Sequence, residues 1–136
     1  MSISHIIVDT NVLLRYLLRD DEKQYQLVEH YFLSDHYKLV LPIQTLCETV
    51  WVMTHTLKLS RTLVNEVIAS LINQDNVLTS DKFASMGIKF MEHGGDFADG
   101  IIAYHSEHYE KAALLTFDKK AQSIAKSLGL KVIDLD

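Results

Sequence analysis

The sequence predicts an α/β fold, a three-layer sandwich in which helices flank a central, mainly parallel sheet. Two observations predict this fold. Short β-branched apolar segments alternate with longer segments of helical periodicity, and parallel neighbouring strands need helical crossovers between them. The 136 residues are 48% hydrophobic, enough for one sizeable core, and no linker or repeat divides them. We therefore expect a single domain over residues 1–136.

The first half of the chain is expected to contain two strands and four helices. The segment from Ile3 to Val8 is almost continuously apolar, as in a central strand buried on both faces. Acids at 20–22 favour a helix start, Pro42 is tolerated in a first helical turn, and Ser60 is a good N-cap. These patterns predict strands at 3–8 and 37–41, and helices at 12–18, 20–32, 43–55 and from 60 onward.

The second half continues the alternation. Ser80 or Asp81 is expected to cap a helix that ends before Gly94, and Asp96 opens another helix. The predicted elements are a short edge strand at 77–79, helices at 80–92, from 96 onward and at 119–128, and strands at 112–116 and 132–135.

Composition excludes several classes of protein. The formal net charge of −5 argues against a module that binds nucleic acid through a basic surface. It counts less against an enzyme whose clustered carboxylates hold a divalent cation. Cys47 is the single cysteine, so no internal disulfide forms. Because no long apolar stretch or export signal is present, we expect a cytoplasmic protein with no membrane association.

Three acids are expected at one edge of the sheet. Asp9 ends the first predicted strand, Asp118 follows the strand at 112–116, and Asp99 lies in the first turn of the helix that begins at Asp96. In open α/β sheets, ligands bind beyond the carboxyl ends of the strands. Clustered carboxylates repel one another unless a cation neutralises them, and Mg²⁺ or Mn²⁺ prefers oxygen ligands of this kind. A metal site with phosphodiester hydrolysis is one interpretation.

Each acid also has an ordinary structural interpretation. Asp9 and Asp118 suit the N-cap positions of the helices that follow them. Asp96 and Asp99 suit a cap and an acid that interacts favourably with the helix dipole. Glu48 lies on the flank of its predicted helix, as a surface residue would. The pattern alone leaves both interpretations open.

The order of four motifs along the whole chain resembles the PIN-domain nucleases, particularly the VapC-type toxins of bacterial toxin–antitoxin pairs. The motifs are Ile7-Val8-Asp9-Thr10-Asn11, Glu48 early in a helix, Phe97-Ala98-Asp99 and Leu115-Thr116-Phe117-Asp118. The resemblance implies a PIN-like fold and a catalytic, metal-binding set of Asp9, Glu48, Asp99 and Asp118. It also implies supporting roles nearby for Thr10, Asn11 and Thr116, while Asp96 is a possible fifth acid that we expect to act as a cap. Gly100 departs from the common Ala and is expected to loosen its helical turn.

The resemblance implies a metal-dependent endoribonuclease that uses Mg²⁺, with Mn²⁺ as a substitute, and is restrained by a cognate antitoxin protein. Basic side chains expected near the rim for RNA phosphates are Arg15, Arg19, Lys23, Lys119 and Lys120. Apolar helix surface at 57–72, with Tyr25, Tyr31 and Phe32, favours a homodimer. The alternatives are a PIN-domain nuclease in general RNA processing, a metal-dependent phosphatase or phosphotransfer domain, and a non-catalytic interaction module. Asn11 speaks against the phosphotransfer class, because the Asp-x-Asp arrangement has an acid at that position.

Overall fold

The structure, a computed structural model, describes residues 2–135 and has the predicted α/β class. Helices separate the three strands, and only helical elements follow the third strand among the described residues. In chain order the elements are β1 (His5–Ile7), α1 (Thr10–Leu18), α2 (Glu22–Leu33), β2 (Lys38–Val40), α3 (Ile43–Trp51), the π-helical turn η1 (Val52–Thr56), α4 (Arg61–Ile72), β3 (Val77–Leu78), α5 (Asp81–Glu92), α6 (Phe97–Tyr104), the 3₁₀ turn η2 (His105–His108) and α7 (Lys119–Ser127).

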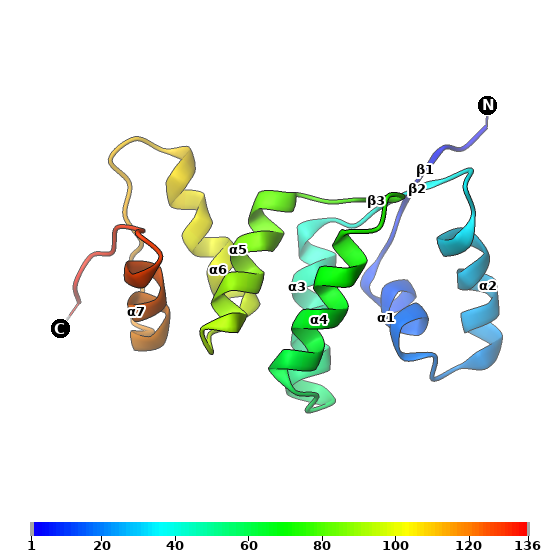
Figure 1. Cartoon of the computed structure of the whole chain (residues 1–136), viewed down its shortest axis with the longest axis horizontal. Helices are drawn as coiled ribbons and strands as arrows, with labels where there is room; N and C mark the ends of the chain where they lie inside the picture. Colours follow the sequence, from blue (N-terminus) through cyan, green and yellow to red (C-terminus); the bar gives the residue numbers. More distant parts are fainter. Residues whose placement is uncertain (1, 136) are drawn as a thin grey trace.

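The sheet is parallel, with strand order β1-β2-β3. Ile6 pairs with Leu39, and Leu39 pairs with Val77, so that each crossover contains helices. Figure 1 shows the sheet with α1 and α2 toward one end of the long axis, and α7 with the C-terminus at the other end. Between residues 2 and 135, no helix has the length and apolar composition needed to cross a membrane.

Two expectations about the strands are wrong. The first strand is not central: β1 lies at the edge of the sheet, and the Ile7 side chain is 66% exposed. The segments expected as strands at 112–116 and 132–135 form one isolated parallel bridge, Leu114 with Val132. The Leu114 side chain packs in a core with α7, and this packing ties the bridge to α7 instead of to β1.

The helix starts follow the predicted caps closely. Asp9 Oδ1 accepts a hydrogen bond from the Val12 amide at 3.0 Å, and Asp118 Oδ1 accepts one from the Ala121 amide at 2.9 Å. Ser60 caps α4 in the same way through its hydroxyl. The helix predicted to reach residue 55 changes its hydrogen bonding after Trp51, where the π-helical turn begins.

The buried apolar side chains form two clusters. The larger cluster joins β1, β2 and helices α1 to α6; its largest fully buried members include Leu13, Leu39, Leu46 and Ile68. The smaller cluster joins α5 and α6 to α7, and consists of Phe90, Ala103, Leu114, Ala121, Ile124, Ala125 and Leu130. Helices α5 and α6 contribute to both clusters and therefore connect the two parts of the core.

Gly100 allows α5 and α6 to approach each other closely. A Cβ atom built on Gly100 would lie 2.6 Å from the Met86 carbonyl oxygen and 2.9 Å from the Gly87 Cα. Both contacts are with backbone, which cannot rotate away as a side chain can. Gly100 thus has a packing role that the sequence did not indicate, because its missing side chain permits the close contact between α5 and α6.

Two buried threonines one turn apart on α3 differ in their hydrogen bonding. Thr45 Oγ1 donates to the Val8 carbonyl oxygen at 2.9 Å and so fixes α3 to the end of β1. The Thr49 hydroxyl is also buried but has no hydrogen-bond partner among the described residues. A buried polar group without a partner destabilises the folded state, whereas a paired one does not.

The same substitution at these two positions is expected to have opposite effects. Thr45→Val removes the donor to the Val8 carbonyl and should lower the free energy of unfolding by about 1–3 kcal/mol. Thr49→Val removes an unpaired hydroxyl and should leave that free energy unchanged or raise it by up to about 1 kcal/mol. Urea unfolding followed by circular dichroism measures both. An equal loss in the two variants would contradict the difference in hydrogen bonding.

Candidate functional site

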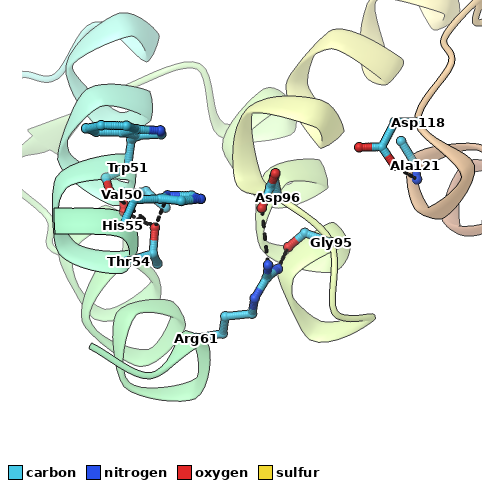
Figure 2. A network of polar contacts seen from close by, with 9 residues as sticks. All are labelled: Val50, Trp51, Thr54, His55, Arg61, Gly95, Asp96, Asp118 and Ala121. Carbon is cyan, nitrogen blue, oxygen red and sulfur yellow. Dashed lines mark hydrogen bonds and ion pairs between the residues drawn. The ribbon is translucent and has the colours of Figure 1, made fainter. Parts of the chain in front are cut away.

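The candidate site is a cleft between the C-terminal half of α3, with η1, and the segment that begins α6. Its volume is about 120 Å³. Asp96 belongs to one wall, and Trp51 and His55 belong to the opposite wall (Figure 2). Asp99, in the first turn of α6, also lines the cleft. The remaining lining residues are Cys47, Val50, Thr54, Arg61, Met91, Gly95, Phe97 and Ala98. The cleft therefore combines an acidic wall with an apolar and aromatic wall.

Asp99 has the most perturbed surroundings of the candidate acids. Its half-buried side chain lies in the first turn of α6. Burial raises the pKa of its carboxyl group, and the nearby charges of Asp96 and Asp118 raise this pKa further. The structure thus places these three acids, from the start of α6 and the start of α7, within electrostatic reach of one another.

The backbone before Asp118 is held by two side chains. The Asp118 amide donates to Thr116 Oγ1 at 3.1 Å, and Gln122 Nε2 donates to the Thr116 carbonyl oxygen at 2.5 Å. The Asp118 carboxylate accepts the α7 cap bond through Oδ1. The cap interpretation of Asp118 is thus confirmed, and Thr116 positions the backbone of this acid.

Asp9 and Glu48 do not join this cleft. Asp9 is exposed, caps α1, and lines a separate cleft together with Asn11 and Arg15, while Thr10 is the first residue of α1. Glu48 is exposed on α3 and is not among the lining residues. The structure therefore brings two of the four predicted acids together, joined by Asp96, and leaves the other two apart.

The carboxylate oxygens of the site suit a hard cation, but too few of them lie close together to form a complete metal site. Carboxylate oxygens without thiolate or imidazole partners are the ligands that Mg²⁺ and Mn²⁺ prefer. Across residues 2–135, however, no group of three or more His, Cys, Asp or Glu side chains is placed to hold a metal ion. Asp99, Asp118 and Asp96 provide the chemistry of such a site without its full set of ligands.

Asp96 stands at the N-cap position of α6, as predicted, but its side chain makes no cap bond. Its carboxylate instead pairs with Arg61 at 3.3 Å, and the Arg61 guanidinium also donates to the Gly95 carbonyl oxygen. Sequence reasoning missed Arg61. The one available signal was a cation in the first turn of a helix, where the dipole disfavours it. Its acidic partner lies in a distant segment of the chain, so the compensation is visible only in the structure.

The basic residues expected to contact RNA at the rim are partly engaged elsewhere. Arg15 donates to Gln24 and pairs with Asp20 at 3.3 Å. Arg19 pairs with Glu22 at 2.8 Å, and its guanidinium lies 4.2 Å from the centre of the Tyr25 ring. These contacts fasten the connection between α1 and α2.

We expect the pKa of Asp99 to report which acids are its neighbours. In metal-free buffer with a chelator, Asp118→Asn should lower this pKa, because a repelling charge is removed. Asp9→Asn is the matched control and should leave it unchanged. The measurement is a titration of the Asp99 carboxyl carbon by NMR. A shift of similar size in both variants would mean that Asp9 lies closer to Asp99 than the structure places it.

The raised pKa of Asp99 also determines how the free energy of unfolding changes with pH. Because the pKa of Asp99 is raised in the folded state, its contribution to stability is fully present below its unfolded pKa of about 3.9 and is lost as pH rises through the folded pKa. Asp99→Asn should therefore raise the free energy of unfolding at neutral pH in chelator and lose this advantage near pH 3.

Comparison with known proteins gives one match. A family model described as the PIN domain matches residues 6–127. No curated protein matches the chain, and no solved structure matches it.

Proposed function

Because the chain belongs to the PIN-domain family, whose domains are typically nucleases, we propose that it is an endoribonuclease dependent on Mg²⁺ or Mn²⁺. The observation that carries the proposal is the position of Asp99, which is half-buried, lines the cleft with Asp96 and lies within electrostatic reach of Asp118. Arg61 pairs with Asp96 only, and the repulsion that raises the pKa of Asp99 is costly; a function that uses the charge of these acids accounts for the cost.

The proposed ligand set is Asp9, Glu48, Asp99 and Asp118, with Asp96 adjacent. When bound, a divalent cation supplies positive charge for the phosphate oxygens and lowers the pKa of water. The chain's own part is to bring the carboxylates together and to orient them. Thr116 positions the segment of Asp118, and the α1 and α7 cap bonds each occupy one oxygen of Asp9 and Asp118. Each capped carboxylate retains a second oxygen for a ligand.

RNA cleavage should require Mg²⁺ or Mn²⁺ and should stop in excess chelator. Asp99→Asn and Asp118→Asn should each lower the cleavage rate by at least about 100-fold, because a ligand charge is removed while the shape is kept. Asp9→Asn and Glu48→Gln should do the same if those acids join the set. The measurement is cleavage of a labelled RNA by purified protein at saturating metal.

The matched control is Asp35→Asn, which changes an exposed acid outside the cleft and should retain the parental rate. Undiminished cleavage in chelator would reject the metal mechanism. Parental rates in both Asp9→Asn and Glu48→Gln, with loss in the other two variants, would restrict the site to the acids near α6 and α7.

A finer proposal is that the nuclease is the toxin of a toxin–antitoxin pair. Its support is the VapC resemblance of the four motifs, together with one contact in the structure. Arg61 already pairs with Asp96 at the cleft, which indicates that a guanidinium is accommodated among these acids. An antitoxin that inserts an Arg or Lys would substitute a fixed positive charge for the cation. Binding and inhibition would then share one surface.

Expression of the chain alone should arrest growth and degrade RNA. Co-expression with the cognate antitoxin should restore growth, because the partner covers the acids, and Asp99→Asn should be harmless without it. Growth curves and RNA integrity measure these outcomes. Normal growth with intact RNA under strong expression of folded chain would reject the toxin role. Cleavage by the purified protein would then favour general RNA processing.

We also propose that the protein is a homodimer. Of the surface expected to support it, Phe32 is buried, whereas Tyr31, Leu57 and Leu63 are exposed. Around β1, Ile7, Leu27 and Tyr31 line an apolar cleft of about 280 Å³. Covering such a surface by a second copy would remove apolar area from water.

We also propose that the protein is located in the cytoplasm.

A further inference from the structure

An exposed aromatic pair faces the acidic wall of the cleft. The Trp51 side chain is 57% exposed, although it belongs to the last turn of α3. Its ring centre lies 5.3 Å from that of His55, with 17° between the two ring planes. The two rings are therefore stacked nearly parallel, and both belong to exposed residues.

The π-helical turn and Thr54 hold the His55 ring in place. Thr54 Oγ1 lies 2.8 Å from the Val50 carbonyl oxygen, to which it can donate. The same hydroxyl oxygen lies within hydrogen-bond distance of His55 Nδ1, at 2.9 Å, with the donor set by the imidazole tautomer. The ring is fixed by this bond with Nε2 directed elsewhere. The pair is therefore preorganised before any ligand binds.

The position of the pair connects it with the proposed catalytic residues. Trp51 and His55 line the same cleft as Asp96 and Asp99. Figure 2 shows the two rings one above the other at their helix, across from the segment that carries Gly95 and Asp96. Glu48 precedes Trp51 by three residues on α3, which places both on neighbouring parts of the same helix face. An extended single strand of RNA that crosses the cleft would meet the aromatic rings of Trp51 and His55 on one wall and carboxylates on the other.

We propose that Trp51 and His55 form a stacking platform for a base of single-stranded RNA, next to the acids of the cleft. This inference rests on the proposed ribonuclease function and identifies how its substrate is held. Aromatic side chains stack on any base and so bind single strands without strict sequence preference. With a net charge of −5, the chain attracts phosphates weakly. Stacking supplies affinity that does not depend on basic charge.

Trp51 is the single tryptophan of the chain, so intrinsic fluorescence reports on this position alone. The probe is an oligouridylate of about ten nucleotides, a length typical of single-strand sites, in chelator to prevent cleavage. The control probe has the same length and charge but carries abasic sugars. We expect the oligouridylate to quench Trp51 fluorescence and the abasic strand to leave it unchanged. Equal responses to the two strands would overturn the proposal.

Variants of Trp51 have no tryptophan fluorescence, so their RNA binding is measured through the fluorescence anisotropy of a dye-labelled oligouridylate. Trp51→Ala should weaken binding by about 5- to 150-fold, as loss of one stacked base does. Trp51→Phe keeps an aromatic face and should bind with intermediate affinity. Tyr109→Ala removes an exposed aromatic side chain outside the cleft and should bind as the parent does. Parental affinity in both folded Trp51 variants would overturn the platform.

The outcome can be separated from that of the proposed ribonuclease function. Base-dependent quenching by a protein that cleaves no RNA would support the platform while rejecting the nuclease. Metal-dependent cleavage with an unchanged KM in Trp51→Ala would retain the nuclease and reject the platform. A raised KM with a nearly unchanged kcat in Trp51→Ala is the result expected if both are correct.

Discussion

The close packing of α5 against α6 at Gly100 is the constraint on which the candidate site depends. With no side chain at Gly100, the first turn of α6 lies against the α5 backbone at Met86 and Gly87. Because Asp99 precedes Gly100 in the same turn of α6, this contact fixes the position of the Asp99 backbone beside the cleft. The same two helices contribute to both core clusters, so one contact also determines how the sheet side and the α7 side of the molecule are joined.

Local patterns predicted most of the fold, because the signals that define its helices act over a few residues. Asp9, Ser60 and Asp118 cap the helices that their sequence positions indicate. Pairing between distant segments was predicted less well. An apolar strand such as β1 reads the same at the centre or at the edge of a sheet, and the partner of 112–116 is decided by the packing of Leu114 against α7. Length and apolar content do not encode that choice.

The candidate site divides in the same way. Motif order singled out Asp99 and Asp118, which the structure brings within electrostatic reach, and Asp9, which it places in another cleft. The ion pair of Arg61 with Asp96 was not predictable from either neighbourhood, because the two residues lie in distant segments and neither segment indicates the other as its partner. The aromatic pair required the π-helical turn, whose altered hydrogen bonding carries no clear sequence signature.

The division of the core into two clusters gives the chain an order of assembly during synthesis. Every buried member of the larger cluster lies at or before Ile101, whereas most of the smaller cluster comes from Leu114 to Leu130. The residues of the larger cluster are therefore all synthesised before most of those of the smaller cluster. Segments that leave the ribosome first fold first. Asp118 is the last of the proposed acids to be synthesised, so a product truncated after the larger cluster contains Asp9, Glu48, Asp96 and Asp99 but lacks both the Asp118 carboxylate and α7.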